Sequence, residues 1–314
     1  MSGADEFGEI ERLFRPLSHG APAALGLLDD AAVLPARRGF DLVITQDGLV
    51  EGVHVLDDAD PALIARKLLR VNLSDLAAKG AEPFGALLTV AWPRRYGPAE
   101  REAFARGLAE DLADFGVDLL GGDTVRTPGA FWASLTALGW VPQGRMVTRG
   151  GARPGDRLMV SGTIGDGALG LAAARGEIAD PDGYLRGRLD RPAPRLELRQ
   201  TLRNFATAAA DVSDGLIADA SHIARASGAR IVIDLDRTPL SPAARVWLEA
   251  QPDRSAALLR LASGGDDYEI VCTMNLDRPD PALTTIGWVE AGAGVEVRLD
   301  GRAVDPGPGG WRHL

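Results

Sequence analysis

The hydrophobic pattern alternates between helical and extended periods along the chain. Apolar residues recur every three or four positions in segments 6–15, 61–79 and 98–115, which predicts helices there. Strand-like runs lie between the helical patterns, and this alternation predicts an α/β fold. The predicted strands are residues 41–45, 85–92, 117–120 and 131–141 in the first half, and residues 157–161, 230–235, 269–274 and 295–299 in the second half.

One acidic residue lies on the apolar stripe of the predicted helix 61–79. The stripe contains Ile64, Leu68, Val71 and Ala78, and the same spacing places Asp75 on it. A buried carboxylate without a partner is costly, so an arginine or lysine, hydrogen-bond donors or a metal ion must compensate it. The periodicity leaves these three alternatives open.

Glycine and proline concentrate in residues 150–156 and predict a domain boundary. A chain of 314 residues is long enough for about two domains of ordinary size. We therefore expect a first domain over residues 1–149 and a second over residues 150–314. Near the end of the second domain, Asp300-Gly301 predicts a hairpin turn.

Composition limits the possible partners. The net charge of -10 and the pI near 5.0 argue against nucleic acid, which is bound by clustered basic residues. The chain has only two lysines, Lys67 and Lys79, so a phosphorylated ligand would need metal cations to neutralise its charge. No long apolar run or signal peptide is visible, which predicts a cytoplasmic protein without a membrane partner. The single Cys272 lies in a strand-like run and is expected to be a core thiol.

Acidic residues also gather beside strand-like runs. Asp29 and Asp30 precede a short run at 31–34, Asp47 and Asp123 follow predicted strands, and the segment 211–216 repeats this pattern. Singly, an aspartate beside glycine is typical of a turn or a helix cap. Together with Asp75 they predict a convergent site, and oxygen ligands without His or Cys clusters favour Mg²⁺, Ca²⁺ or Mn²⁺ over zinc. Ser213 or Asp214 could cap the helix that follows, and its N-terminus could accept an anion. The acidic residues of this set are Asp29, Asp30, Asp47, Asp123, Asp211 and Asp214.

The surrounding sequence does not support either of two common nucleotide-binding motifs. Residues 165–170 fit G-x-G-x-x-G after a strand, but no second strand ending in a ribose-binding acid follows. A tight glycine turn is the better interpretation. A P-loop is excluded because neither lysine follows its glycine pattern.

Six segments, in order, resemble the thiamine-monophosphate kinase family. They are LLDDAAVL at 27–34, QDGLVEGVH at 46–54, VNLSDLAAKGAEP at 71–83, GGDT at 121–124, DVSDGL at 211–216 and SGGDDYE at 263–269. The resemblance extends from Glu6 to the C-terminus. The wider superfamily includes aminoimidazole ribonucleotide synthetase and selenophosphate synthetase, and residues 50–54 and 263–269 favour the kinase.

The resemblance implies a two-domain synthetase-like fold with the active site in the cleft between the domains. The N-terminal domain would be a mixed sheet that dimerises, and the C-terminal domain would be α/β. The implied ligands are ATP, thiamine monophosphate and several Mg²⁺ ions, and a monovalent-cation requirement is left open. The implied partner is a second copy of the chain.

The resemblance also assigns residues. Gln46 departs from it, since a hydroxyl residue often stands there, and Asp266 replaces a commoner glutamate. Trp311 could stack on thiamine or merely pack. The implied metal ligands are Asp30, Thr45, Asp47, Asp75, Asp123, Asp211 and Asp214; the ATP contacts are Gly122, Asp123, Arg149 and Ser213; the substrate contacts are His54, Asp266 and Trp311.

The expected reaction is direct, metal-assisted transfer of the γ-phosphoryl group without a general base. The acceptor is a phosphate that is largely ionised at neutral pH, so no proton need be removed from it. One alternative is another ATP-using enzyme of the superfamily, although the chain lacks an N-terminal cysteine for selenium chemistry. A non-enzymatic cation-binding protein is the other, but calcium modules concentrate their ligands in one loop.

Overall fold

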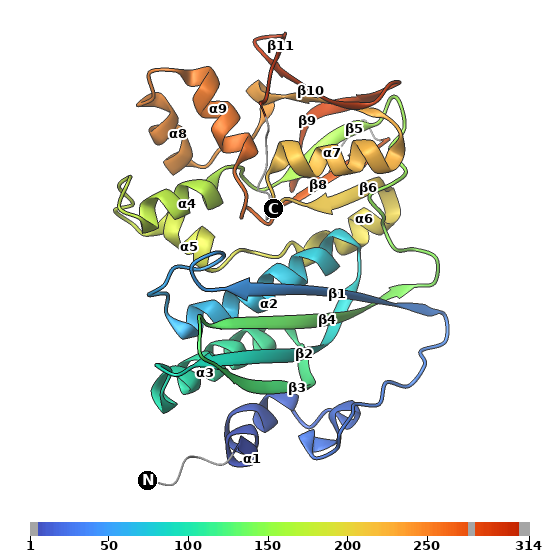
Figure 1. Ribbon diagram of the computed structural model, residues 1–314. Helices are drawn as coiled ribbons and strands as arrows, with labels where there is room; N and C mark the ends of the chain where they lie inside the picture. The colour runs from blue at the N-terminus through green and yellow to red at the C-terminus, as the bar shows by residue number, and fades with distance from the viewer. Residues whose placement is uncertain (1–5, 276–279, 308–314) are drawn as a thin grey trace. The chain divides into compact units, whose positions relative to one another are not determined.

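The computed structural model describes residues 6–275 and 280–307 (Figure 1). The chain forms two compact units, one from residues 1–76 and 81–144 and the other from residues 77–80 and 145–314. The domain boundary expected after residue 149 stays a prediction. Trp311 lies outside the described residues.

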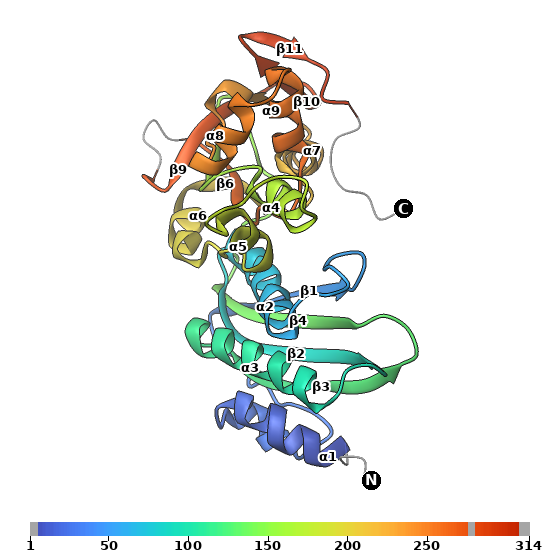
Figure 2. The same ribbon diagram turned by 90° about the vertical axis from the view of Figure 1, so that its left-hand side faces the viewer.

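The first unit contains a four-stranded sheet, and helices α2 and α3 lie on one face of it (Figures 1 and 2). Its strand order is β1-β4-β2-β3, with β2 and β3 parallel and the other pairs antiparallel. The strands are β1 (Phe40–Val50), β2 (Glu82–Pro93), β3 (Asp118–Thr127) and β4 (Trp132–Pro142). The helices are α1 (Glu6–Glu9), the π-helix η1 (Ile10–Phe14), the 3₁₀ turns η2 (Arg15–Ser18) and η3 (Pro22–Leu27), α2 (Pro61–Ala78) and α3 (Pro98–Phe115).

Alternation along β1 separates the two faces of this sheet. Val43 and Leu49 are buried, whereas Leu42, Ile44 and Val50 are exposed. The stripe predicted on α2 is confirmed, because Ile64, Leu68, Val71 and Ala78 are all buried. The apolar stripe and the alternating strand thus account for one face covered by α2 and α3. The other face is open along Val50 and Ile44, apart from the end where Ala24 of η3 packs against Leu120 and Leu138.

Two details of the sequence prediction were wrong. Asp47 and Asp123 do not follow their strands but lie inside them, because β1 and β3 are longer than their apolar runs. The helix expected over residues 6–15 is α-helical only in Glu6–Glu9 and continues as a π-helix and a 3₁₀ turn.

The second unit contains a seven-stranded mixed sheet of order β11-β10-β7-β9-β5-β8-β6. Its strands are β5 (Arg157–Ser161), β6 (Ala206–Asp211), β7 (Arg230–Asp234), β8 (Ile270–Met274), β9 (Leu283–Glu290), β10 (Gly294–Leu299) and β11 (Arg302–Val304). Its helices are α4 (Asp166–Ala174), α5 (Tyr184–Asp190), α6 (Arg199–Phe205), α7 (Leu216–Ser227), α8 (Pro242–Glu249) and α9 (Arg254–Ser263), with 3₁₀ turns η4 (Leu196–Leu198) and η5 (Leu235–Arg237).

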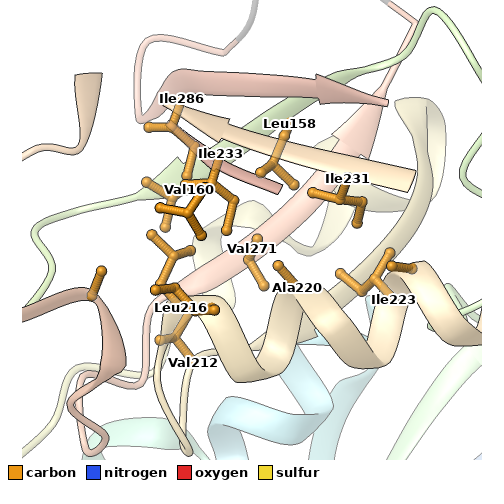
Figure 3. Close-up of a cluster of buried hydrophobic side chains, with 14 of the residues drawn as sticks. Leu158, Val160, Val212, Leu216, Ala220, Ile223, Ile231, Ile233, Val271 and Ile286 are labelled. Carbon is orange, nitrogen blue, oxygen red and sulfur yellow. The ribbon is translucent and has the colours of Figure 1, made fainter. Parts of the chain in front are cut away.

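The main core of this unit lies between α7 and the sheet (Figure 3). Leu216, Ala220 and Ile223 of α7 point toward strand residues that include Val160 and Val271. The hairpin predicted at Asp300-Gly301 is confirmed by the antiparallel pair of β10 and β11, and Cys272 is buried as expected. Among the described residues, no helix combines the length and the hydropathy needed to cross a membrane.

Candidate functional site

In the first unit, Thr45 of β1 and Asp75 of α2 form a direct pair. The Thr45 hydroxyl donates to Asp75 Oδ2 over 2.5 Å. One helical turn before Asp75, the Asn72 side-chain oxygen accepts the backbone N–H of Asp47 over 3.0 Å. Two polar contacts therefore hold α2 on β1, and they place the Thr45 side chain beside Asp75 and the Asp47 backbone beside Asn72.

Asp75 is half-buried, so its burial is less complete than the periodicity suggested. Its hydrogen bond to Thr45 supplies a donor, which was one of the three expected ways to compensate the carboxylate. The hydroxyl and carboxylate oxygens of this pair are hard donors that suit Mg²⁺. A metal ligand is therefore compatible with the geometry and stays a prediction.

The other predicted residues of the first unit lie at the surface. Asp30 is exposed, and its backbone N–H donates to the Asp29 carboxylate over 2.8 Å. Asp123 is exposed on β3 opposite Thr89 of β2. Convergence of Asp30 and Asp123 with Asp75 stays a prediction.

The residue before Asp123, Gly122, is a glycine for a steric reason. Its φ is +154°, and a Cβ added there would lie 1.8 Å from the carbonyl oxygen of Leu88. Any side chain would collide with the neighbouring strand. The glycine therefore permits close approach of β3 to β2 at the point where Asp123 emerges.

His54 lies in a tight turn just after β1. The backbone N–H of Val50 donates to His54 Nδ1 over 3.1 Å, and the buried Lys67 donates to the His54 carbonyl oxygen over 3.4 Å. Because Nδ1 accepts a hydrogen bond, the neutral ring carries its proton on Nε2. The turn thus fixes both the orientation and the tautomer of His54.

In the second unit, Asp211, Ser213 and Asp214 lie in the loop between β6 and α7. Asp211 is buried at the end of β6. The backbone N–H groups of Ser213 and Asp214 donate to Asp219 Oδ2 over 3.0 and 3.1 Å. The expectation that Ser213 or Asp214 caps α7 was wrong, because the N-cap residue is Gly215.

Asp219 gives this loop unusual electrostatics. Its burial, and secondarily the charge of Asp214, raises the pKa of Asp219 to about 7. Burial, and secondarily the charge of Arg149, lowers the pKa of His222. One ligand atom from each of Asp214, Asp219 and His222 lies within 4.8 Å of the others. The structure therefore places the His222 imidazole near these carboxylates, which the sequence pattern did not predict.

The segment that contains Asp266 is bonded to the same loop. The N–H of Asp266 donates to the Ser213 carbonyl oxygen over 2.9 Å, and the N–H of Tyr268 donates to the Val212 carbonyl oxygen over 2.8 Å. Asp266 and Tyr268 have φ values of 67° and 51°, a region that non-glycine residues rarely adopt. The structure thus brings together Ser213 and Asp266, which were assigned to different substrates.

Asp267, which the sequence reading missed, explains the G-x-G-x-x-G segment. Its two carboxylate oxygens accept the N–H groups of Gly165 and Gly167 at the start of α4, over 2.7 and 2.9 Å. The positions that would receive a dinucleotide phosphate are filled by a side chain of the protein itself. The interpretation as a structural glycine turn is consistent with this geometry.

A second missed residue, Glu269, lies in a buried ion-pair network. Its carboxylate accepts two hydrogen bonds from Arg195, one from Arg188 and one from the Ser161 hydroxyl. The hydrogen bond to Glu269 raises the pKa of Arg195. Arg188 also donates to the Asp267 carbonyl oxygen over 3.1 Å, so the network supports the segment from Asp266 to Glu269.

Comparison with known proteins gives consistent results for both halves of the chain. The family model of the AIR synthase related protein N-terminal domain matches residues 28–141, and that of the C-terminal domain matches residues 153–300. Thiamine-monophosphate kinase of Caulobacter vibrioides is 55% identical, with coverage of 98% of this chain and 90% of the relative. The Escherichia coli K12 enzyme is 41% identical, with coverage of 90% and 87%.

Two solved structures match over nearly full length. Thiamine-monophosphate kinase from Stenotrophomonas maltophilia K279a has a TM-score of 0.82 and 39% identity, with coverage of 95% of this chain and 98% of that one. AaThiL complexed with AMPPCP and TMP has a TM-score of 0.81 and 32% identity, with coverage of 100% and 99%. Similarity therefore includes the two-unit architecture as well as the local motifs.

Proposed function

Since this chain belongs to the thiamine-monophosphate kinase family, we propose that it transfers the γ-phosphoryl group of ATP to thiamine monophosphate, giving thiamine diphosphate and ADP. The observation that carries the proposal is the near full-length match to AaThiL, a protein solved with AMPPCP and TMP. The proximity of the Ser213 and Asp266 segments supports it, because one hydrogen-bonded pair of loops can serve both substrates.

We assign the predicted residues to three tasks. Hard oxygen donors such as the Thr45–Asp75 pair and the buried Asp211 fit Mg²⁺. When bound, such ions supply neutralisation of the phosphate charge and alignment of the reacting oxygens. The proposed metal ligands are Asp30, Thr45, Asp47, Asp75, Asp123, Asp211 and Asp214; the ATP contacts are Gly122, Asp123, Arg149 and Ser213; the thiamine monophosphate contacts are His54 and Asp266.

The residues of the chain perform positioning rather than proton abstraction. The acceptor phosphate is already ionised, so the transfer requires no general base. The Val50 N–H fixes the orientation of the His54 ring and leaves the proton of the neutral ring on Nε2. The Thr45 hydroxyl orients the Asp75 carboxylate. We propose direct in-line transfer without a phosphoenzyme.

Product analysis tests the function. The chain is incubated with Mg-ATP and thiamine monophosphate, and thiamine diphosphate, ADP and AMP are quantified. Equal amounts of thiamine diphosphate and ADP are expected. ADP without thiamine diphosphate would refute the kinase assignment, and AMP in place of ADP would indicate diphosphate transfer instead.

Asp75→Asn tests the metal assignment. Asparagine keeps the shape and can still accept the Thr45 hydrogen bond, but it removes the charge. We expect kcat to fall on the order of 100-fold or more, with partial recovery at high Mg²⁺. The matched control is Asp114→Asn, because Asp114 is an exposed aspartate of α3. Near-normal turnover of Asp75→Asn at modest Mg²⁺ would overturn the metal role.

ATP binding measured by calorimetry with Mg²⁺ and with EDTA tests the cation requirement separately from turnover. The proposal assigns the ATP phosphates to cations that carboxylates hold. The affinity for ATP should therefore fall at least tenfold in EDTA. Equal affinity in both buffers would contradict this assignment.

We propose that the open face of the first unit's sheet forms a homodimer. Val50, Trp132, Ala91 and Val125 form one row across the strands, and three of them are large apolar residues that remain exposed by 37–40%. Ile44 on the same face of β1 is exposed by 59%. Apolar surface of this kind is typical of an interface. Ile44→Asp should shift the mass measured by light scattering from dimer to monomer, and a wild-type monomer would refute the proposal.

A further inference from the structure

Asp219 is a carboxylate on the apolar stripe of α7. The stripe contains Leu216, Ala220 and Ile223, which face the main core of the second unit (Figure 3). Asp219 lies at the same helical face and is only 1% exposed. Burying a carboxylate at such a position costs free energy of folding unless hydrogen bonds or a charged partner compensate it.

Among the described residues, the side-chain hydrogen bonds of Asp219 go to one short segment of backbone. Its Oδ2 atom accepts the consecutive N–H groups of Ser213 and Asp214, at 3.0 and 3.1 Å. Its Oδ1 atom is buried and has no hydrogen-bond partner among the described residues. A single oxygen therefore makes both contacts.

The rest of this backbone segment is held by the strand-like segment that contains Asp266. The Val212 N–H donates to the Glu269 carbonyl oxygen over 2.7 Å, and the carbonyl oxygens of Val212 and Ser213 accept the N–H groups of Tyr268 and Asp266. The N–H groups of Ser213 and Asp214 donate to Asp219 instead. The peptide groups of residues 212–214 are thereby held by two different segments of the unit.

We propose that Asp219 is a positioning residue for the nucleotide. By drawing the two N–H groups inward, it fixes the backbone from which the Ser213 and Asp214 side chains project toward ATP and its cation. The proposal rests on the proposed function, which assigns Ser213 and Asp214 to these ligands. It also means that the start of α7 binds the protein's own carboxylate, and the Ser213 and Asp214 amides do not contact the phosphates.

Because Oδ2 alone accepts both hydrogen bonds, substitutions of Asp219 can distinguish the positioning role from direct binding of a cation. Asp219→Asn can place its carbonyl oxygen where Oδ2 lies and keep both hydrogen bonds, while the amide group replaces Oδ1. Asp219→Ala loses both hydrogen bonds. A cation held by Asp219 with Asp214 and His222 would require the charge, so asparagine would then be as harmful as alanine.

Amide hydrogen exchange and steady-state kinetics together test the proposal. In Asp219→Ala, exchange at the Ser213 and Asp214 amides should accelerate at least tenfold, and the KM for Mg-ATP should rise about tenfold, while the KM for thiamine monophosphate changes less than about threefold. Asp219→Asn should restore amide protection and bring the KM for Mg-ATP within about threefold of wild type.

Asp253→Ala is the matched control, because Asp253 caps α9 in the same unit by accepting the Ala256 N–H. This variant also loses a carboxylate-to-backbone hydrogen bond at a helix start, so it should lower stability without changing the KM for Mg-ATP.

Three results would overturn the positioning role: unchanged exchange in Asp219→Ala, a KM for Mg-ATP that alanine leaves unchanged, or an asparagine variant as impaired as the alanine variant. If Asp219→Ala fails to fold, the asparagine variant alone decides between hydrogen bonding and charge. If the wild type makes no thiamine diphosphate, the proposed function fails, whereas the exchange results still test the contacts of Asp219.

Discussion

Replacement of the buried Glu269 by glutamine should strongly destabilise the second unit. Its Oε1 atom accepts from Arg188 and Arg195 over 2.8 and 2.5 Å, and its Oε2 atom accepts from Arg195 and Ser161 over 2.6 Å each. Glutamine must put an amide donor where one of these oxygens lies. At Oε1 the amide would face donors of both arginines, and at Oε2 it would face Arg195 Nε, while the Ser161 hydroxyl could turn to accept.

The expected loss of unfolding free energy follows from the arginine charge that remains buried without the Glu269 carboxylate. The Arg188 side chain is 13% exposed and would lose its close ionic partner at Glu269. Removing one member of a buried ion pair costs about 3–5 kcal/mol, and the loss of one or two charge-assisted hydrogen bonds at about 1.5–3 kcal/mol each is of the same order. We therefore expect a loss of about 3–5 kcal/mol in unfolding free energy.

Urea unfolding followed by tryptophan fluorescence measures this loss. The control is Glu296→Gln, because Glu296 pairs with Arg298 and Arg230 near the surface and its loss should cost less than about 1 kcal/mol. If Glu269→Gln cost no more than the control, the network would not stabilise the fold as argued.

Three further predictions concern single residues. Gly122→Ala should lower the melting temperature far more than Gly144→Ala, since its Cβ would lie 1.8 Å from a carbonyl oxygen and that of Gly144 meets nothing within 4 Å. Burial raises the pKa of Cys272 to about 12, so Ellman's reagent should label it only in denaturant. The pKa of Asp219 is raised from 3.8 to about 7, so the folded chain keeps a proton that the unfolded chain loses. Stability relative to Asp219→Asn should therefore fall as the pH rises from about 4 to about 7 and then level off, as melting temperatures in EDTA would show.

The sequence predicted elements well where apolar periodicity and length agreed. Helix α2 and strands β2 and β4 appear close to their expected positions, because each has a clear stripe or apolar run. Strand β6 was missed because its sequence, ATAAAD, is rich in alanine, which favours helices when considered locally. Its pairing with β8, a contact between residues distant in sequence, determines that it is a strand.

The same reasoning identified one buried carboxylate and missed another. Asp75 was noticed because it interrupts an apolar stripe, and its pairing with Thr45 depends on register that no periodicity reveals. Asp219 interrupts the stripe of α7 in the same way and could have been found by the same count. Asp267 gives no such signal, since its role depends on the meeting of two segments about 100 positions apart.

Two helix starts in the second unit are filled by carboxylates of the chain itself. Gly165 and Gly167 at α4 donate to Asp267, and Ser213 and Asp214 before α7 donate to Asp219. Elsewhere such N–H groups receive phosphates, but here an anion would meet a carboxylate. The two lysines already donate to carbonyl oxygens, Lys67 to His54 and Lys79 to Ala209. On the proposed function, arginine and divalent cations must therefore supply most of the positive charge for ATP in a chain with a net charge of -10.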